Sequence, residues 1–185
     1  SESTDEDSTV SVSDGASADL LELASDPDTS DTISLDKIDG NSFSDGSQVT
    51  VGSSATVTVN SDGSWSYDPN GQFENLDPGD STTDSYTYTV TDNDGDTDKG
   101  TITLTINGQN DAPTGVSLSS TDVGQSGGTD AVVGSFSSTD TDSDDSHTYS
   151  LVSGSGDGDN DQFNINSGDL RADDASSMAA GNYDV

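Results

Sequence analysis

Strict alternation of apolar and polar residues is the feature that most limits what this chain can fold into. It is clearest at residues 55–59 (ATVTV), 87–90 (TYTV) and 101–106 (TITLTI). Successive side chains of a strand point to opposite faces, so a period of two predicts strands with one buried face. No segment has the period of an amphipathic helix. The alternation therefore predicts an all-β protein.

The charge of the chain opposes folding. Acidic residues number 37 against 3 basic ones, the formal net charge is −34, and only 26% of residues are apolar, a composition typical of disorder. We therefore expect bound cations to offset repulsion and cross-link a thin core. The same charge excludes nucleic-acid binding. No apolar run reaches the roughly 20 residues of a membrane helix, so we expect no direct membrane insertion, and cysteine is absent.

Turn-forming residues divide the chain into two predicted domains. The segment Asn107–Pro113 follows an alternating run and ends in proline, which cannot continue a ladder. We place one Ig-like Greek-key β-sandwich at residues 1–110 and a second at residues 111–185. Strands are predicted near residues 8–12, 19–23, 32–38, 48–52, 55–60, 64–67, 85–91, 99–107, 115–119, 131–138, 147–153, 162–166, 169–172 and from 182. The second domain then lacks its last strand or two, so we expect it to be truncated or completed in trans.

Acids at i, i+2 and i+4 in loops are the strongest chemical signal. They occur at residues 92–96 (DNDGD), 140–144 (DTDSD) and 157–161 (DGDND). A curved loop can aim such carboxylates at one hard cation, and calcium accepts about six to eight oxygens with more tolerant geometry than magnesium. None is an EF-hand, because the twelfth position holds Thr103, Leu151 or Gly168 instead of Glu. Alternatively, the acidic turns only solvate the surface of a protein from a marine or halophilic microbe.

The first half resembles a bacterial cadherin-like repeat of the VCBS type. The matching residues are 4–7 (TDED), 26–28 (DPD), 62–67 (DGSWSY), 86–92 (YTYTVTD) and 110–113 (NDAP). The second half is similar to a cadherin repeat at residues 140–142 (DTD), 148–151 (TYSL) and 163–165 (FNI). The resemblance implies tandem cadherin-like β-sandwiches from a large secreted adhesin.

In cadherin families calcium lies at the junction of successive repeats, so the resemblance implies a ligand set for Ca²⁺. It combines acids of the first domain, linker residues and paired acids of the second domain: Glu6, Asp77, Asp80, Asn110, Asp111, Asp140 and Asp142. Asp26, Asp28 and Asp92 are implied to form the corresponding half-site for a preceding repeat. Where the family has an early Glu, the second domain has Gln125, a poorer ligand, so its lower end is expected to bind calcium weakly or not at all.

Catalysis is not expected. Gly124–Gly128 matches the pattern of a hydrolase nucleophile elbow, but that motif needs a preceding strand, a following helix and a partnered histidine. The single histidine, His147, is expected to lie in a strand beside the acidic loop.

The aromatic residues have two possible roles. Core packing is the default for Trp65, Tyr67, Phe73, Tyr86 and Tyr88, whereas exposed rings would provide a platform for stacking on carbohydrate.

The sequence as a whole predicts a non-catalytic, calcium-rigidified adhesion or spacer module of an extracellular or cell-surface protein, with neighbouring repeats as partners. Two alternatives stay open: a filament subunit assembled by strand exchange between identical subunits, and a module that binds surface polysaccharide. The chain starts at Ser1 with no basic and apolar leader, so we expect any signal peptide to be missing or removed.

Overall fold

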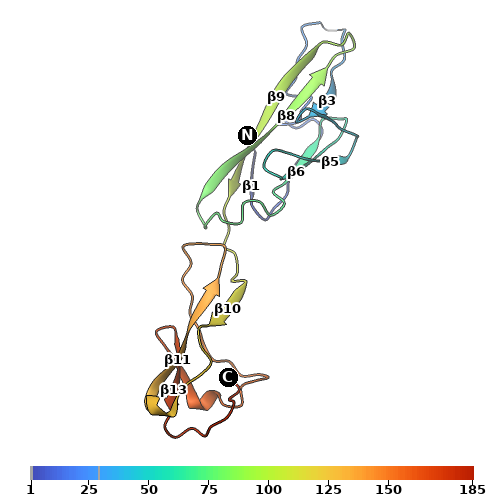
Figure 1. Cartoon of the computed structure of the whole chain (residues 1–185). Coiled ribbons are helices and arrows are strands. Elements are labelled where there is room, and N and C mark those ends of the chain that lie inside the picture. Colours follow the sequence, from blue (N-terminus) through green and yellow to red (C-terminus); the bar gives the residue numbers. More distant parts are fainter. Residues whose placement is uncertain (1, 29) are drawn as a thin grey trace. The chain divides into compact units, whose positions relative to one another are not determined.

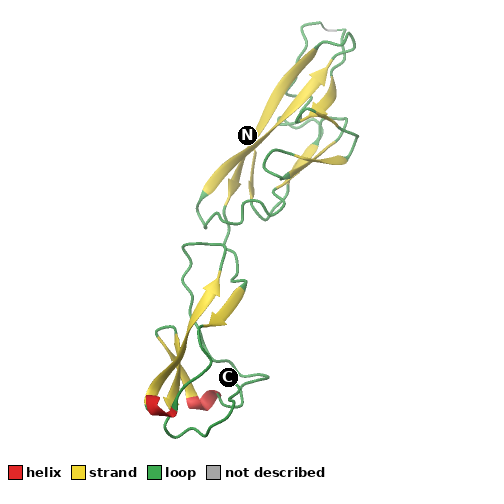
Figure 2. Cartoon of the chain, viewed as in Figure 1, coloured by secondary structure: helices red, strands yellow, loops and turns green. Residues whose placement is uncertain are grey.

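The computed structural model describes residues 2–28 and 30–185 and has the all-β fold class predicted from the sequence (Figure 1). The chain divides into two compact units, Ser1–Asn110 and Asp111–Val185, which are described separately. The helical segments of the described residues are two short 3-10 turns in the second unit (Figure 2). No helix among the described residues of the chain is long and apolar enough to cross a bilayer.

The first unit contains two sheets. Its strands are β1 Glu2–Asp5, β2 Val10–Val12, β3 Ser34–Ile38, β4 Asn41–Ser42, β5 Ser47–Thr50, β6 Thr56–Val59, β7 Trp65–Asp68, β8 Ser81–Thr91 and β9 Thr97–Asn107. The larger sheet has the order β1-β9-β8-β3-β4, with β1 parallel to β9 and the other neighbours antiparallel. The smaller sheet has the order β2-β7-β6-β5 and is antiparallel.

The strands β8 and β9 form a long hairpin in the middle of the larger sheet (Figure 1). Its register runs from Ser81 opposite Asn107 to Thr91 opposite Thr97. The sequence predicted β8 only from residue 85, and the polar residues 81–84 join the strand because β9 offers them a ladder partner. The hairpin places its own turn, residues 92–96, at one end of the unit and residues 107–110 at the other.

The core of the first unit lies between its two sheets. Trp65 packs edge-on against Tyr86 with ring centroids 5.8 Å apart, and its indole N–H donates to the carbonyl of Ala18 at 2.9 Å. The core packing predicted for the aromatic rings is confirmed, with full or partial burial of Trp65, Tyr67, Phe73, Tyr86 and Tyr88. Rings enclosed in this way are not available to stack on a sugar.

The strand predicted at residues 19–23 is wrong, because this segment forms turns. The carboxylate of Asp19 accepts the backbone N–H groups of Leu21 at 2.8 Å and Glu22 at 3.3 Å. These donors are therefore occupied by a side chain instead of a neighbouring strand. Leu20 is still completely buried, so the segment contributes to the core without being a strand.

The second unit has one antiparallel sheet in its described residues. Its elements are β10 Gly115–Leu118, η1 Gln125–Gly127, β11 Thr129–Thr139, η2 Asn160–Gln162, β12 Phe163–Asn166 and β13 Asp169–Asp174. The strand order is β10-β11-β13-β12. The buried core is small: Ala131, Val133, Phe163, Leu170, Ala172, Ala175 and Met178. The acidic residues 140–145 begin where β11 ends.

The strands predicted near residues 147–153 and from residue 182 are also wrong, and His147 lies in a loop rather than in a strand. Residues 147–152 alternate between partly buried and exposed, and Tyr149 stacks on Phe136 of β11 with ring centroids 4.9 Å apart. Within the described part of the chain, however, the backbone of this segment pairs with no strand. Residues 147–152 therefore have the side-chain pattern of a strand, but no strand among the described residues forms backbone hydrogen bonds with them.

Candidate metal-binding loops

Three carboxylates converge in the loop of the second unit that follows β11. Asp140, Asp142 and Asp145 each offer one carboxylate oxygen, and these oxygens lie within 4.8 Å of one another. β11 ends at Thr139, and a turn at residues 143–144 brings Asp145 back toward the first two acids. The turn therefore groups residues i, i+2 and i+5.

Asp142 is the buried member of this group, with 3% of its surface exposed. Its Oδ2 accepts the backbone N–H of Asp111 at 2.6 Å, and the hydroxyl of Thr141 donates to Oδ2 of Asp111 at 3.0 Å. Its Oδ1 is buried and has no hydrogen-bond partner within the described residues. Burying a carboxylate oxygen without a donor is costly, and a cation is one partner that removes the cost.

His147 lies beside the first acid of the loop. Its Nε2 is 3.4 Å from Oδ2 of Asp140, a contact that is an ion pair only when the imidazole is protonated. That distance is long for a hydrogen bond, and Oδ2 of Asp140 is a second buried oxygen for which the described residues supply no hydrogen bond. The other oxygen, Oδ1, accepts the N–H of Asp142 at 3.2 Å. The loop thus contains two buried carboxylate oxygens that receive no hydrogen bond from the described residues.

A second group of carboxylates lies in the first unit, at the end that carries the β8–β9 turn. Asp26, Asp31 and Asp92 offer oxygens within 4.8 Å of one another, and all three are half-buried. Oδ1 of Asp92 accepts three backbone N–H groups of its turn at 2.7–2.9 Å, from Asp94, Gly95 and Asp96. Asp26 and Asp92 also line a cleft of about 200 Å³.

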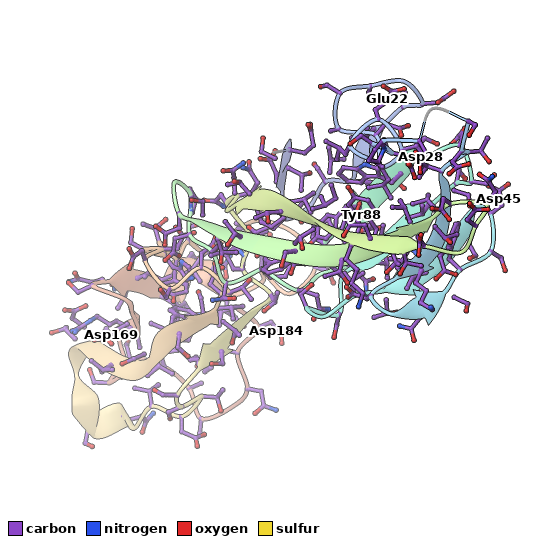
Figure 3. All side chains as sticks on the ribbon, turned by 90° about the horizontal axis from the view of Figure 1, so that it is seen from above. Glu22, Asp28, Asp45, Tyr88, Asp169 and Asp184 are labelled. Atoms are coloured by element: carbon purple, nitrogen blue, oxygen red, sulfur yellow. The ribbon has the colours of Figure 1, made fainter. Side chains whose placement is uncertain are left out.

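Asp26 and Asp92, two of the three residues predicted for this half-site, lie in this group, whereas the third, Asp28, lies outside it. Asp28 is exposed, and its N–H donates to Oδ1 of Asp26 at 2.8 Å (Figure 3). Asp31, which was not predicted, contributes the third oxygen. Its backbone N–H donates to the carbonyl of Asp28 at 2.9 Å.

Glu6 lies at the opposite end of the first unit, beside the end of β9. It is 2% exposed, its Oε1 accepts the N–H of Gln109 at 2.7 Å, and its own N–H donates to the carbonyl of Asn107 at 3.0 Å. Two acids that were not predicted, Asp7 and Glu74, offer carboxylate oxygens within 4.8 Å of each other.

The loop that contains Asp77 and Asp80 is held against the same end. Gly108 donates its N–H to the carbonyl of Asp80 at 3.0 Å. A Cβ on Gly108 would lie 2.2 Å from the carbonyl oxygen of Leu76 and 2.5 Å from that of Asp77, so only glycine permits this approach. The segments that carry Glu6, Asp77 and Asp80 therefore meet near the end of the unit, where the exposed Asn110 is its last residue.

Gln125 lies in η1, and its side-chain amide donates to the carbonyl of Met178 at 2.6 Å. The 3-10 turn is three residues long and leads into β11. Gly124–Gly128 therefore does not adopt the strand–turn–helix arrangement that a nucleophile elbow needs.

The sequence does contain an indication that Asp145 joins the group, namely the turn-forming residues before it, but an analysis of alternating acids misses it. Acids at i, i+2 and i+4 share a direction only while the chain stays extended, which favours Asp144. Ser143 and Asp144 are turn formers, and the turn that they make carries Asp144 out of the group and Asp145 into it.

Comparison with known proteins agrees with the β fold. A family model described as the bacterial cadherin-like domain matches residues 1–108. A search of curated proteins finds no match. Domains of this type are extracellular modules of the adhesion type, are typically non-catalytic and generally bind Ca²⁺. The matched residues cover more than half of the chain, which belongs to the family of bacterial cadherin-like domains.

Proposed function

We propose that this chain is a calcium-rigidified spacer of a large secreted or cell-surface adhesin, with a VCBS-type repeat at residues 1–110, a cadherin-like repeat at residues 111–185, and no catalytic role. Calcium bound around the covalent link Asn110–Asp111 would limit hinge motion between the repeats. The proposed ligands remain Glu6, Asp77, Asp80, Asn110, Asp111, Asp140 and Asp142. Neighbouring repeats are the proposed partners.

The observation that carries the proposal is the buried carboxylate of Asp142. A charged group at 3% exposure needs compensation, and the N–H of Asp111 supplies it to one oxygen only. The other oxygen, Oδ1, has no hydrogen-bond partner in the described residues, and two more carboxylates of the same loop lie close to Asp142, so that their charges repel. A divalent cation removes both costs. Calcium is favoured over magnesium because the donors are oxygens held at irregular positions.

The carboxylates of Asp26, Asp31 and Asp92 support a similar role at the other end of the first unit. We propose that this group accepts an ion together with a preceding repeat. The resemblance implied Asp28 as its third ligand, and the geometry favours Asp31 in that position.

Solution scattering tests the spacer function. Small-angle X-ray profiles would be recorded in calcium and in a calcium chelator, at one ionic strength set with sodium chloride, with magnesium as the control for divalent charge. We expect chelation to broaden the distribution of interatomic distances and magnesium to restore it only in part. Identical profiles in calcium and chelator would contradict the proposal.

A second candidate function is a filament subunit that exchanges strands between copies. The specific observation is the segment 147–152, whose side chains alternate like those of a strand while its backbone pairs with no strand in the described residues. A strand from another copy could supply the missing ladder. Sedimentation over a wide concentration range tests it: growth of oligomers that Ser150→Pro abolishes would support strand exchange, and a concentration-independent monomer would contradict it.

A further inference from the structure

We propose that the loop Asp140–Asp145 binds its cation with side chains of the second unit alone, and that Asp145, rather than Asp144, is its third carboxylate ligand. The inference rests on the proposed function in one respect, that a divalent cation binds here. It goes further by identifying a ligand and by predicting that this site fills independently of the first unit.

The geometry assigns the ligand. Asp140, Asp142 and Asp145 offer oxygens within 4.8 Å of one another, a span that one ion with oxygen ligands at about 2.3–2.6 Å can bridge. Asp144 is the neighbour that a simple alternation selects, and the turn at residues 143–144 leaves it outside the group.

The second, independent observation is the buried oxygen of Asp142. Oδ1 has no hydrogen-bond partner in the described residues, whereas the N–H of Asp111 holds Oδ2 and so fixes the orientation of the carboxylate. Asp111 itself belongs to the second unit. One oxygen of the buried group is thus held and the other has no hydrogen-bond partner among the described residues, and the other two acids lie in the same loop.

The order of binding follows from this arrangement. The loop supplies three anionic ligands from one short segment, so the entropy cost of gathering them is met when the second unit folds. Carboxylates of the first unit, such as Glu6, can then add to calcium binding near the linker only as a separate event. We therefore expect at least two classes of calcium site, of which the loop is filled first.

Calorimetric titration of the whole chain with calcium at low ionic strength tests the ligand assignment. Asp145→Asn and Asp144→Asn form a matched pair, since they are adjacent, exposed and remove the same charge. We expect Asp145→Asn to weaken the tightest class of sites by at least about tenfold and Asp144→Asn to change it by no more than about twofold. Equal effects of the two variants, or a larger effect of Asp144→Asn, would overturn the assignment.

Asp7→Asn tests independence from the first unit. It removes an exposed carboxylate of the first unit that is not among the proposed ligands. We expect the tightest calcium class to keep its affinity in this variant, and a loss equal to that of Asp145→Asn would refute independence. Scattering on the same samples separates the two proposals. Tight binding at the loop with a scattering profile that calcium does not change would support this inference and refute the spacer function. A profile that depends on calcium, together with no effect of Asp145→Asn on calcium affinity, would refute this inference and support the spacer function.

Discussion

The first unit buries a set of aromatic rings between two sheets, whereas the second buries little apolar volume under one sheet. Both units enclose carboxylates, Glu6 and Asp19 in the first and Asp142 in the second. Trp65, Tyr67 and Tyr86 lie in the first core, and the second core consists mainly of smaller or aliphatic side chains. In the second unit Asp142 is as inaccessible as the core residues. The difference teaches that one very acidic chain can be stabilised in two ways, by apolar burial in one unit and, in our proposal, by a bound cation in the other.

Trp65→Ala should have the largest effect on stability. It removes a ring that is 2% exposed together with its hydrogen bond to Ala18, and comparable substitutions cost about 3–5 kcal/mol. If the comparison of the units holds, the loss is the same in calcium and in chelator. Chemical denaturation of the first unit measures it, and a cost that vanishes on addition of calcium would show that this unit too depends on the ion.

Removing calcium should act mainly on the second unit. Ligand linkage gives about 2.7 kcal/mol of stabilisation at a calcium concentration about one hundred times the dissociation constant. Trp65 is the only tryptophan of the chain and reports the first unit by fluorescence, while hydrogen exchange of β11 and β13 reports the second. We expect chelation to increase exchange in β11 and β13 and to leave the unfolding of the first unit nearly unchanged. Equal loss in both units would break the comparison.

The sequence predicts the strands that have an apolar pattern of their own better than the strands that form only by pairing with a neighbour. Alternating apolar residues predicted β6, β7, β9 and most of β8, because burial on one face is written in the sequence itself. The short polar strands β1 and β4 were not predicted, since pairing with β9 and β3 forms them rather than any pattern of their own. Residues 19–23 and 147–153 carry strand-like patterns, but a side chain takes the donors of the first and the second has no ladder partner in the described residues.

The candidate site was predictable in part for a similar reason. The resemblance and the acidic spacing selected Asp140, Asp142, Asp26 and Asp92, which the structure brings into two groups. Asp31 and Asp145 could not be selected by period, because local turns decide which acid folds back. The roles of all these residues as calcium ligands stay predictions.

Asp142→Asn should change the stability of the second unit in opposite directions with and without calcium. The amide keeps the shape of the carboxylate but removes a charge that is 3% exposed. In calcium we expect a loss of about 2 kcal/mol, because an anionic ligand is gone, and in chelator a neutral or slightly stabilising effect, because repulsion with Asp140 and Asp145 is relieved. Asp122→Asn, at an exposed position, is the control. Destabilisation of equal size in both conditions would indicate a purely structural role.

Alkaline pH should destabilise the first unit through its buried tyrosines. Burial raises the pKa of Tyr86, and burial together with the hydrogen bond to the Asp84 carboxylate raises the pKa of Tyr67. Because the folded pKa values lie above the unfolded one, stability is complete below about pH 10 and falls above it by about 1.4 kcal/mol per pH unit for each tyrosine.

Tyr86→Phe sharpens this prediction. The Tyr86 hydroxyl is buried and has no hydrogen-bond partner in the described residues, so phenylalanine should cost little at neutral pH. Above about pH 10 the variant should lose stability less steeply than the parent chain in denaturation measured across the pH range. Parallel slopes for the two proteins would contradict the assignment of the alkaline transition to Tyr86.

The smallest effect is expected in the carboxylate group of the first unit. Asp31→Asn should weaken a low-affinity class of calcium sites several-fold, about 1 kcal/mol, whereas Asp28→Asn should leave it unchanged because Asp28 lies outside the group. Titration followed by nuclear magnetic resonance shifts of the 92–96 turn would measure both. The opposite ranking would favour Asp28, the ligand that the resemblance implies.

The most direct test of the account is anomalous X-ray diffraction from crystals of this chain grown in calcium. The account predicts an anomalous peak within ligand distance of Asp140, Asp142 and Asp145, with Oδ1 of Asp142 among the ligands. A loop without that peak, in which water or a protein donor satisfies Oδ1 of Asp142, would contradict the claim that a cation stabilises the second unit.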